Sequence, residues 1–161
     1  MPNRRDLRFK NLRFPPGFRS IRDSDRTQRV RSRERLMDQS QPSDYLEWSK
    51  ESGHLVVVHV VRKKVVAIMH VYVESGAQRD GECLVLDMLA VDQAFRGRGI
   101  GPALILVADD VARQLSINEL RLEALNPGLI GFYQRFGYER FGDPIPYVEW
   151  GEVYPMRKRI A

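Results

Sequence analysis

Cysteine, histidine and long apolar runs are all scarce in this chain of 161 residues. Its single cysteine, Cys83, excludes an internal disulfide framework, and one cysteine with three scattered histidines predicts no metal centre. The longest apolar stretches, 55–61 and 84–91, are far shorter than the roughly 18 residues of a membrane-spanning helix. The N-terminus lacks the apolar segment of a secretory signal. We therefore expect a cytoplasmic protein with no membrane partner.

Composition and charge indicate one folded domain with a basic N-terminal region. Hydrophobic residues make up 43% of the chain and charged residues 29%, which is typical of neither a disordered nor a collagen-like protein. The net charge is +5, yet residues 1–35 hold twelve Lys/Arg and only four Asp/Glu. We expect a basic extension over residues 1–17 and a single domain over 18–161.

The apolar periodicity and the turn formers predict a mixed α/β fold. Strands are expected at 18–22, 54–61, 65–73, 83–91, 119–125, 138–141 and 147–156, with an added strand within 1–17. Helices are expected at 26–37, from Ser43, at 102–115 and at 129–136. The second and third strands of the domain form a hairpin, and residues 83–125 form a parallel strand–helix–strand crossover. The fold class is thus a mixed, mostly antiparallel sheet around this crossover, with helices on both faces.

The most informative segment is the loop at 96–102, between a buried strand and an amphipathic helix. Three glycines within five residues allow successive backbone N–H groups to turn toward one point, and the following helix adds its positive end. Arg96 and Arg98 supply charges that pair with phosphate oxygens. The spacing matches neither a P-loop nor a dinucleotide fingerprint. The loop therefore predicts a phosphate site, and the alternative is a plain glycine-rich connector with solvated arginines.

Two motifs resemble those of the GNAT acetyltransferase superfamily. In residues 89–101, Arg96, Gly99 and Gly101 match the pattern Gln/Arg-x-x-Gly-x-Gly/Ala of its motif A. Downstream, the run 126–138 is similar to Asn-x-x-Ala-x-x-x-Tyr-x-x-x-Gly-Phe, although Leu129 replaces the alanine. Pro102 also departs from the family, because it removes one N–H donor from the anion site. The resemblance covers residues 56–138 well and the two ends only in outline.

The resemblance implies that the chain binds acetyl-CoA. In the family, the loop's backbone holds the pyrophosphate, and the preceding strand pairs with the pantetheine arm and polarises the thioester carbonyl, here through the N–H of Leu89. Carried over, the positions implied are Leu89, Ala90, Val91, Arg96, Gly97, Arg98, Gly99, Ile100, Gly101, Asn126, Phe132 and Tyr133.

Three residues are candidates for the chemistry. Tyr133 matches the family tyrosine that protonates the departing CoA thiolate; the alternative is a ring packed against the sheet. Asp87 is the first candidate for the general base, and Glu123 on the neighbouring strand is the second. The alternative for Asp87 is an ion pair with Arg121 or a solvated carboxylate at a bulge. His70 is a weaker candidate, expected to be structural.

The sequence leads to two hypotheses of function. The first is an N-acetyltransferase that moves an acetyl group from acetyl-CoA to a primary amine by direct attack on the thioester, without a metal. The amine acceptor, the size of the acyl group and the existence of a homodimer stay open. The second is a non-catalytic GNAT-like module that docks to RNA, the ribosome or another acidic partner. Its basic surface would comprise Arg26, Arg29 and Arg33 on one helix face, with Arg4, Arg5, Arg8 and Lys10.

Overall fold

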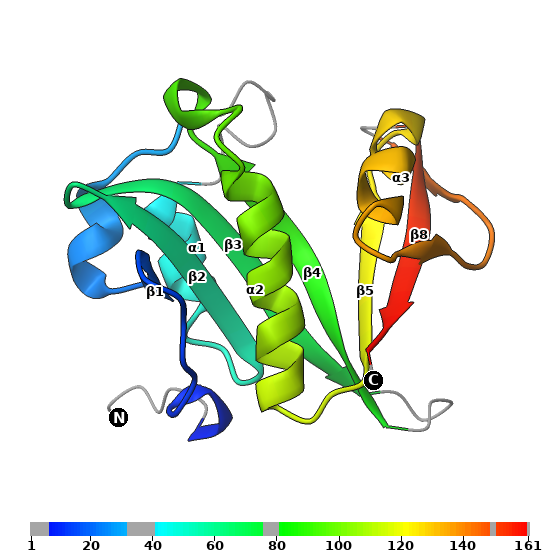
Figure 1. Cartoon of the computed structure of the whole chain (residues 1–161), viewed down its shortest axis with the longest axis horizontal. Coiled ribbons are helices and arrows are strands. Elements are labelled where there is room, and N and C mark those ends of the chain that lie inside the picture. Colours follow the sequence, from blue (N-terminus) through cyan, green and yellow to red (C-terminus); the bar gives the residue numbers. More distant parts are fainter. Residues whose placement is uncertain (1–6, 32–40, 76–80, 149–150, 161) are drawn as a thin grey trace.

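The computed structural model describes residues 7–31, 41–75, 81–148 and 151–160, and a single large sheet dominates it (Figure 1). The strands are β1 (Phe18–Ser20), β2 (His54–Val61), β3 (Lys64–Ser75), β4 (Glu82–Val91), β5 (Glu119–Ala124), β6 (Glu139–Arg140), β7 (Ile145–Tyr147) and β8 (Gly151–Arg159). The helices are α1 (Pro42–Trp48), α2 (Ile100–Gln114) and α3 (Pro127–Gln134). The sheet runs in the order β1-β2-β3-β4-β5-β8-β6, and β7 pairs with β8.

Neighbouring strands are antiparallel except at one place. β4 and β5 are parallel and are joined by α2, which confirms the predicted crossover. Every other pair in the described sheet is antiparallel. The predicted fold class is therefore confirmed.

The β2–β3 hairpin shows how local sequence fixes the centre of the sheet. Its strands are rich in valine, whose branched side chain suits a pleated, buried surface. Arg62 and Lys63 reverse the chain with positive φ angles of 49° and 65°. Both angles lie in the left-handed region that a two-residue type I′ turn requires. The turn consists of Arg62 and Lys63 alone, because Lys64 is already the first residue of β3.

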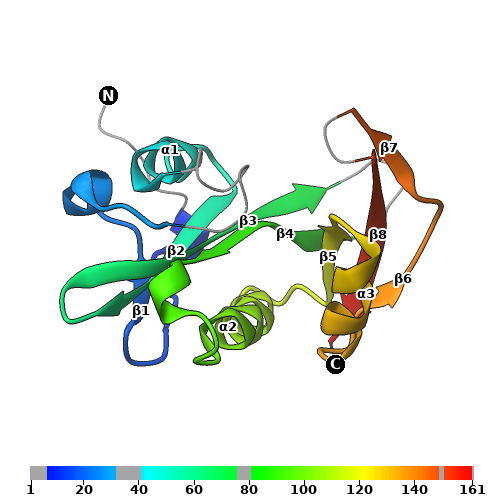
Figure 2. The same ribbon diagram turned by 90° about the horizontal axis from the view of Figure 1, so that it is seen from above.

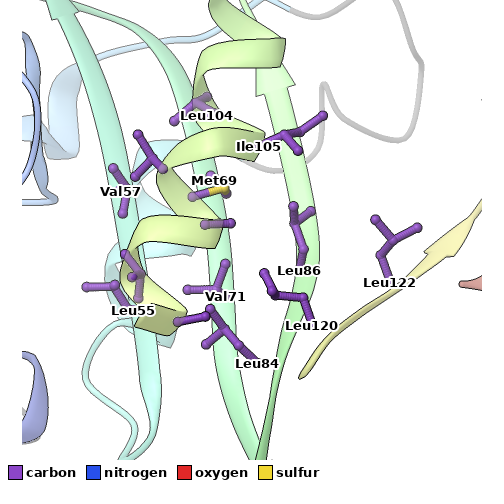
Figure 3. Close-up of a cluster of buried hydrophobic side chains, with 14 of the residues drawn as sticks. Leu55, Val57, Met69, Val71, Leu84, Leu86, Leu104, Ile105, Leu120 and Leu122 are labelled. Carbon is purple, nitrogen blue, oxygen red and sulfur yellow. The ribbon is translucent and has the colours of Figure 1, made fainter. Parts of the chain in front are cut away.

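Helices cover both faces of the β1–β4 half of the sheet, as Figure 2 shows. On one face α2 buries its apolar stripe, and Leu104 and Ile105 lie against Val57, Met69 and Leu86 (Figure 3). On the opposite face α1 covers a second cluster of buried side chains: Ile21, Val30, Tyr45, Leu46, Val56, Val58, Val65, Ile68 and Ala90. Burying a side chain of this size contributes about 1.5–3 kcal/mol. The sheet from β1 to β4 therefore has a packed hydrophobic core on each of its two faces.

The N-terminal region departs from the prediction in two places. Within 7–17 the chain forms no strand; Leu7–Phe9 is a short 3-10 helix, and Phe9, Leu12 and Phe14 pack against the core. The side-chain amide of Gln114 hydrogen-bonds both the N–H and the C=O of Arg13, so a helix side chain satisfies the backbone that a strand partner would have satisfied.

The helix predicted at 26–37 is also wrong in the part that the structure describes. A 3-10 helix, Asp23–Thr27, ends before residues 28–31, which are irregular; residues 32–37 lie outside the described residues. Tertiary hydrogen bonds replace helical ones here, because Arg31 donates its N–H to the Asp92 carboxylate and accepts from the N–H of Gln93. Among the described residues, no helix has the length and apolar character to span a bilayer.

Candidate active site

A large cavity opens where β4 and β5 part. The two strands are paired only at Leu84 with Leu120 and at Val85 with Arg121, and beyond these positions they diverge (Figures 1 and 2). The space between them is a cavity of about 1070 Å³. Its wall is formed by the loop at residues 96–102, called the glycine loop below, and by the second half of β4, β5, α3 and the segment around β7.

The glycine loop forms one end of the cavity. Gly97, Gly99, Ile100 and Gly101 all line it, and α2 begins at Ile100. Gly97 and Gly99 have φ angles of +75°, and a Cβ at either position would meet no atom within 4 Å. The first N–H groups of a helix have no partner within the helix. The loop therefore presents backbone donors and the positive end of α2 to an open space, which suits a diphosphate.

The exposed edge of β4 forms a second wall. Asp92 donates its N–H to the Val66 carbonyl of β3 at 2.8 Å. Because alternate residues of an extended strand direct their N–H groups to opposite sides, Leu89 and Val91 direct theirs toward the gap between β4 and β5. Both side chains also line the cavity. This edge can accept an extended ligand as an additional strand.

Asp87 lies at a β-bulge in β4. His70 of β3 pairs with Met88 and Val71 pairs with Leu86, so Asp87 between them has no partner in the register. A bulge re-aims a side chain, and the Asp87 carboxylate lines the cavity with 43% of its side chain exposed. Its Oδ2 is 3.0 Å from His70 Nδ1. The partner of Asp87 is therefore His70 rather than Arg121, whose guanidinium pairs with Glu119 at 2.9 Å.

His70, the weaker candidate from the sequence, contacts Asp87, and His54, which the sequence analysis did not single out, contacts His70. His70 Nε2 is 2.9 Å from His54 Nδ1, so two histidines stand in line behind Asp87. A signal was present in the hairpin. His54 faces Tyr72 in the register, which makes His70 its diagonal neighbour on the same face of the sheet.

Acidic groups gather at the end of the cavity opposite the glycine loop. Glu74, Asp87 and Glu123 all line it, with Tyr72 beside them. Burial raises the pKa of Glu123, and the nearby carboxylates of Asp87 and Glu74 raise it further. Burial and the same negative surroundings raise the pKa of Tyr72 to about 12. A positively charged group in this region would relieve the repulsion among these carboxylates.

Tyr133 lies on α3, where its ring packs against neighbouring aromatic rings and its side chain also reaches the cavity wall; its role as a proton donor stays a prediction. Its side chain lines the cavity, while its ring contacts Phe132 and Tyr138 with centroids 5.2 and 6.0 Å apart. Phe132 lines the cavity as well. The ring packing holds the phenol at the cavity wall.

Three predicted binding residues do not line the cavity. Ala90 is buried in the cluster beneath α1. The Arg98 guanidinium lies 4.9 Å from the centre of the Phe95 ring, whereas Arg96 lines the cavity. Asn126 is the N-cap of α3, and its side chain accepts a hydrogen bond from the Leu129 N–H at 3.2 Å. These positions shape the loop and the helix, and their contact with a ligand stays a prediction.

The basic surface proposed for nucleic acid loses its helical face. Arg29 lies in irregular backbone, and Arg4, Arg5 and Arg33 lie outside the described residues. Arg8 pairs with Glu82 at 3.1 Å and Arg26 with Glu47 at 3.9 Å. Ion pairs within the chain therefore take up part of the charge that a phosphate backbone would need.

Comparison with known proteins identifies the family. A sequence profile of the Acetyltransferase (GNAT) family matches residues 18–138, which is most of the chain. The chain belongs to the GNAT acetyltransferase family. The resemblance seen in the two motifs is thereby confirmed, and the diverging strands with the glycine loop are the part of this GNAT fold that forms the cavity.

Relatives and solved structures agree with this assignment. An acetyltransferase of Agrobacterium fabrum is 29% identical over 77 residues, which cover 48% of this chain and 56% of that protein, so the match spans only about half of the relative's length. The crystal structure of Ard1 from Thermoplasma volcanium has a TM-score of 0.66 at 21% identity and covers 89% of this chain and 97% of its own. A GNAT family acetyltransferase from Elizabethkingia anophelis with acetyl-CoA bound has a TM-score of 0.56 at 16% identity and covers 79% and 83%. These structures share the fold, and the family supports acyl transfer and the use of CoA.

Within the residues that the structure describes, no group of three or more His, Cys, Asp or Glu side chains is placed to hold a metal ion.

Proposed function

We propose that this GNAT protein transfers an acetyl group from acetyl-CoA to the amine of a cationic acceptor, by direct attack of the amine on the thioester. The observation that supports this most is that one continuous cavity joins a donor-rich helix N-terminus to a carboxylate at the β4 bulge. One end suits a diphosphate, and the other end suits an ammonium group. The thioester, when bound, supplies the activated acetyl group and a thiolate leaving group.

The binding steps use the backbone of the chain. The N–H groups of 99–101 and the α2 dipole hold the diphosphate, and Arg96 adds charge at the same end. Leu89 and Val91 direct their backbone groups to the pantetheine arm. The N–H of Leu89 then stabilises the negative charge that develops on the thioester oxygen.

The chemical steps require two proton transfers from the nitrogen. Asp87 takes one proton from the ammonium group, which frees the lone pair for attack. After attack the nitrogen loses a second proton to the solvent, and Asp87 releases the first one there as well. The thiolate gains a proton from the Tyr133 phenol, which takes a proton back from the solvent. The balance is one ammonium and one thioester converted into one amide, one thiol and one proton in solution.

Turnover and a loop variant test this proposal. The full chain is incubated with acetyl-CoA and a panel of primary amines and diamines, and free thiol is measured. Gly101→Glu places a carboxylate beside the diphosphate site, where the nearest atom to a new Cβ is Val91 Cγ2 at 3.9 Å. We expect at least about a 10-fold rise in the KM for acetyl-CoA, because a like charge in a recognition site costs several kcal/mol.

Leu106→Glu is the matched control. It adds the same charge to the same helix at an exposed position outside the cavity wall, so its KM should equal that of the wild type. The proposal is contradicted if no amine in the panel causes release of free thiol. It is also contradicted if the two variants raise the KM for acetyl-CoA equally.

A further inference from the structure

A row of polar side chains crosses three neighbouring strands of the sheet, from the cavity at β4 to the start of β2. It comprises Asp87 on β4, His70 on β3, His54 on β2 and Glu51 in the turn before β2. Asp87 Oδ2 is 3.0 Å from His70 Nδ1, His70 Nε2 is 2.9 Å from His54 Nδ1, and His54 Nε2 is 3.5 Å from Glu51 Oε2. We call these four residues the relay row. One end opens on the cavity, and the other reaches the exposed Glu51.

Packing holds both imidazoles of the relay row in place. His70 is 3% exposed, and the ring of Trp48 from α1 lies over it with centroids 5.0 Å apart. The two imidazole planes differ by only 18°. Tyr72 contacts the His54 ring with centroids 5.3 Å apart. The His70 ring therefore cannot turn without displacing Trp48 of α1, and the His54 ring is held between His70 and Tyr72.

A count of protons determines which nitrogens carry hydrogen. Ionised carboxylates only accept, and a neutral imidazole has one donor and one acceptor nitrogen. If His70 Nδ1 donates to Asp87, His70 Nε2 must accept from His54 Nδ1–H. The remaining nitrogen, His54 Nε2, then has no proton to give to Glu51. This contact, at 3.5 Å, is the longest of the three, which agrees with the absence of a proton between the two atoms.

Burial and the neighbouring His70 favour the neutral form of His54. Burial lowers the pKa of His54, and His70 lowers it further, while Glu51 and Asp87 oppose this shift. Beyond the relay row, the charge of Asp87 also acts on Tyr45 of α1, Tyr72 of β3 and Glu123 of β5, and Asp44 and Glu74 lie near those same groups.

We propose that His70 and His54 are positioning residues for Asp87, with both rings held as the Nδ1–H tautomer so that His70 fixes the carboxylate at the cavity wall. This inference rests on the proposed function, because it assumes that Asp87 receives the amine proton. The Nδ1–H of His70 occupies one carboxylate oxygen and leaves the other for that proton. His54 acts one step further away, since its Nδ1–H keeps His70 Nε2 unprotonated.

Histidine tautomers can be read without any substrate. The chain has only three histidines, so long-range ¹H–¹⁵N correlation spectra of the full protein at pH 7.5 resolve each ring, assigned with His54→Asn and His59→Asn. We expect Nδ1–H with bare Nε2 for both His70 and His54. An Nε2–H tautomer at either ring, or an imidazolium at His70, overturns the proposal.

Asp87→Ala gives the sharper spectroscopic result. Without the carboxylate, both rings can reverse to Nε2–H, since His54 then donates to Glu51 and all remaining contacts are satisfied. We expect His70 and His54 to switch tautomer together. His59 serves as the internal control, because its Nδ1 bonds the Gly17 carbonyl at 2.9 Å, outside the relay row. No switch at either ring contradicts the coupling.

Kinetics separates positioning from simple packing. His70→Asn keeps an N–H near the Nδ1 position and should lose about 10-fold in kcat, while His70→Leu should lose about 100-fold, the range for outer-shell partners of catalytic groups. The KM for acetyl-CoA should not change in either variant, because the relay row does not touch the glycine loop. His59→Asn, on the same strand as His54, should match the wild type.

The two proposals fail in different ways. If the wild type consumes no acetyl-CoA with any amine, the proposed function fails and the spectra still decide the tautomers. If turnover depends on Asp87 but His70→Leu, folded by its thermal unfolding curve, retains wild-type kcat, the positioning role is wrong and the proposed function stands.

Discussion

The sheet is closed from β1 to β4 and open at the junction between β4 and β5. Between β1 and β4, helices cover both faces and the strands pair along their length. Between β4 and β5 the ladder stops after two residue pairs, and the cavity takes its place. The closed half provides stability, and the open junction gives up backbone hydrogen bonds that a ligand can supply. Substitutions in the closed half should therefore affect unfolding, and those at the junction should affect turnover.

The largest effect is expected at the bulge. Asp87→Asn keeps the size of the side chain and removes the general base, so kcat should fall by about 10²–10⁴-fold. Thermal stability should change little, because the carboxylate is partly exposed. Steady-state kinetics with acetyl-CoA and an amine measures the loss. Asp143→Asn, which alters another carboxylate of the cavity wall, is the control; equal losses in the two variants would show that net charge matters rather than the base.

The closed half can be tested through Leu104. This side chain is completely buried between α2 and the sheet, and Leu104→Ala should destabilise the fold by about 2–5 kcal/mol through lost transfer energy and a residual cavity. Leu129→Ala, at the cavity wall, should cost less, since Leu129 is only partly buried. Urea unfolding of both variants measures the difference. A larger cost at Leu129 would invalidate the contrast between the two regions.

The role of Tyr133 predicts an intermediate effect. Tyr133→Phe keeps the ring contacts with Phe132 and Tyr138 and removes only the hydroxyl. If the phenol protonates the thiolate, kcat should fall about 100-fold, near the lower end of general acid catalysis, with the KM for acetyl-CoA unchanged. Tyr147→Phe, also in the cavity wall, should retain activity. An unchanged kcat for Tyr133→Phe leaves this tyrosine with a packing role alone.

The smallest effect concerns Glu123 and pH. Its pKa is raised in the folded state by burial and by neighbouring carboxylates. Ionised Glu123 therefore lowers the free energy of unfolding, because the unfolded chain accommodates the negative charge more easily than the folded protein does. The penalty is absent at acidic pH and grows as pH rises above the ordinary glutamate pKa. Glu123→Gln should therefore raise stability at pH 7 by a few tenths of a kcal/mol, a small value because solvent screens the group. Thermal melts at pH 7 and pH 4 check this, and a gain that is larger at pH 4 would reverse the sign.

The elements along the chain were largely predictable. The valine-rich hairpin, the β4–α2–β5 crossover and α3 follow from apolar periodicity, and each lies within a few residues of its expected place. The helix predicted at 26–37 failed over the described residues 26–31, where Asp25 accepts from the Arg19 side chain and from the Arg22 N–H and so closes a tight 3-10 turn. Those contacts depend on the β1 strand beside the turn. Periodicity does not record such a partner.

The sequence by itself determined the β2–β3 hairpin, the β4–α2–β5 crossover, the glycine loop at the start of α2 and the family, because each depends on residues close together in the chain. Only the tertiary structure decided that β4 and β5 separate after two pairs, that Asp87 lies at a bulge and that His70 and His54 stand behind it. These features arise where separate strands, paired across the sheet, set one another's register. A one-residue shift in that register would direct His70 to the opposite face.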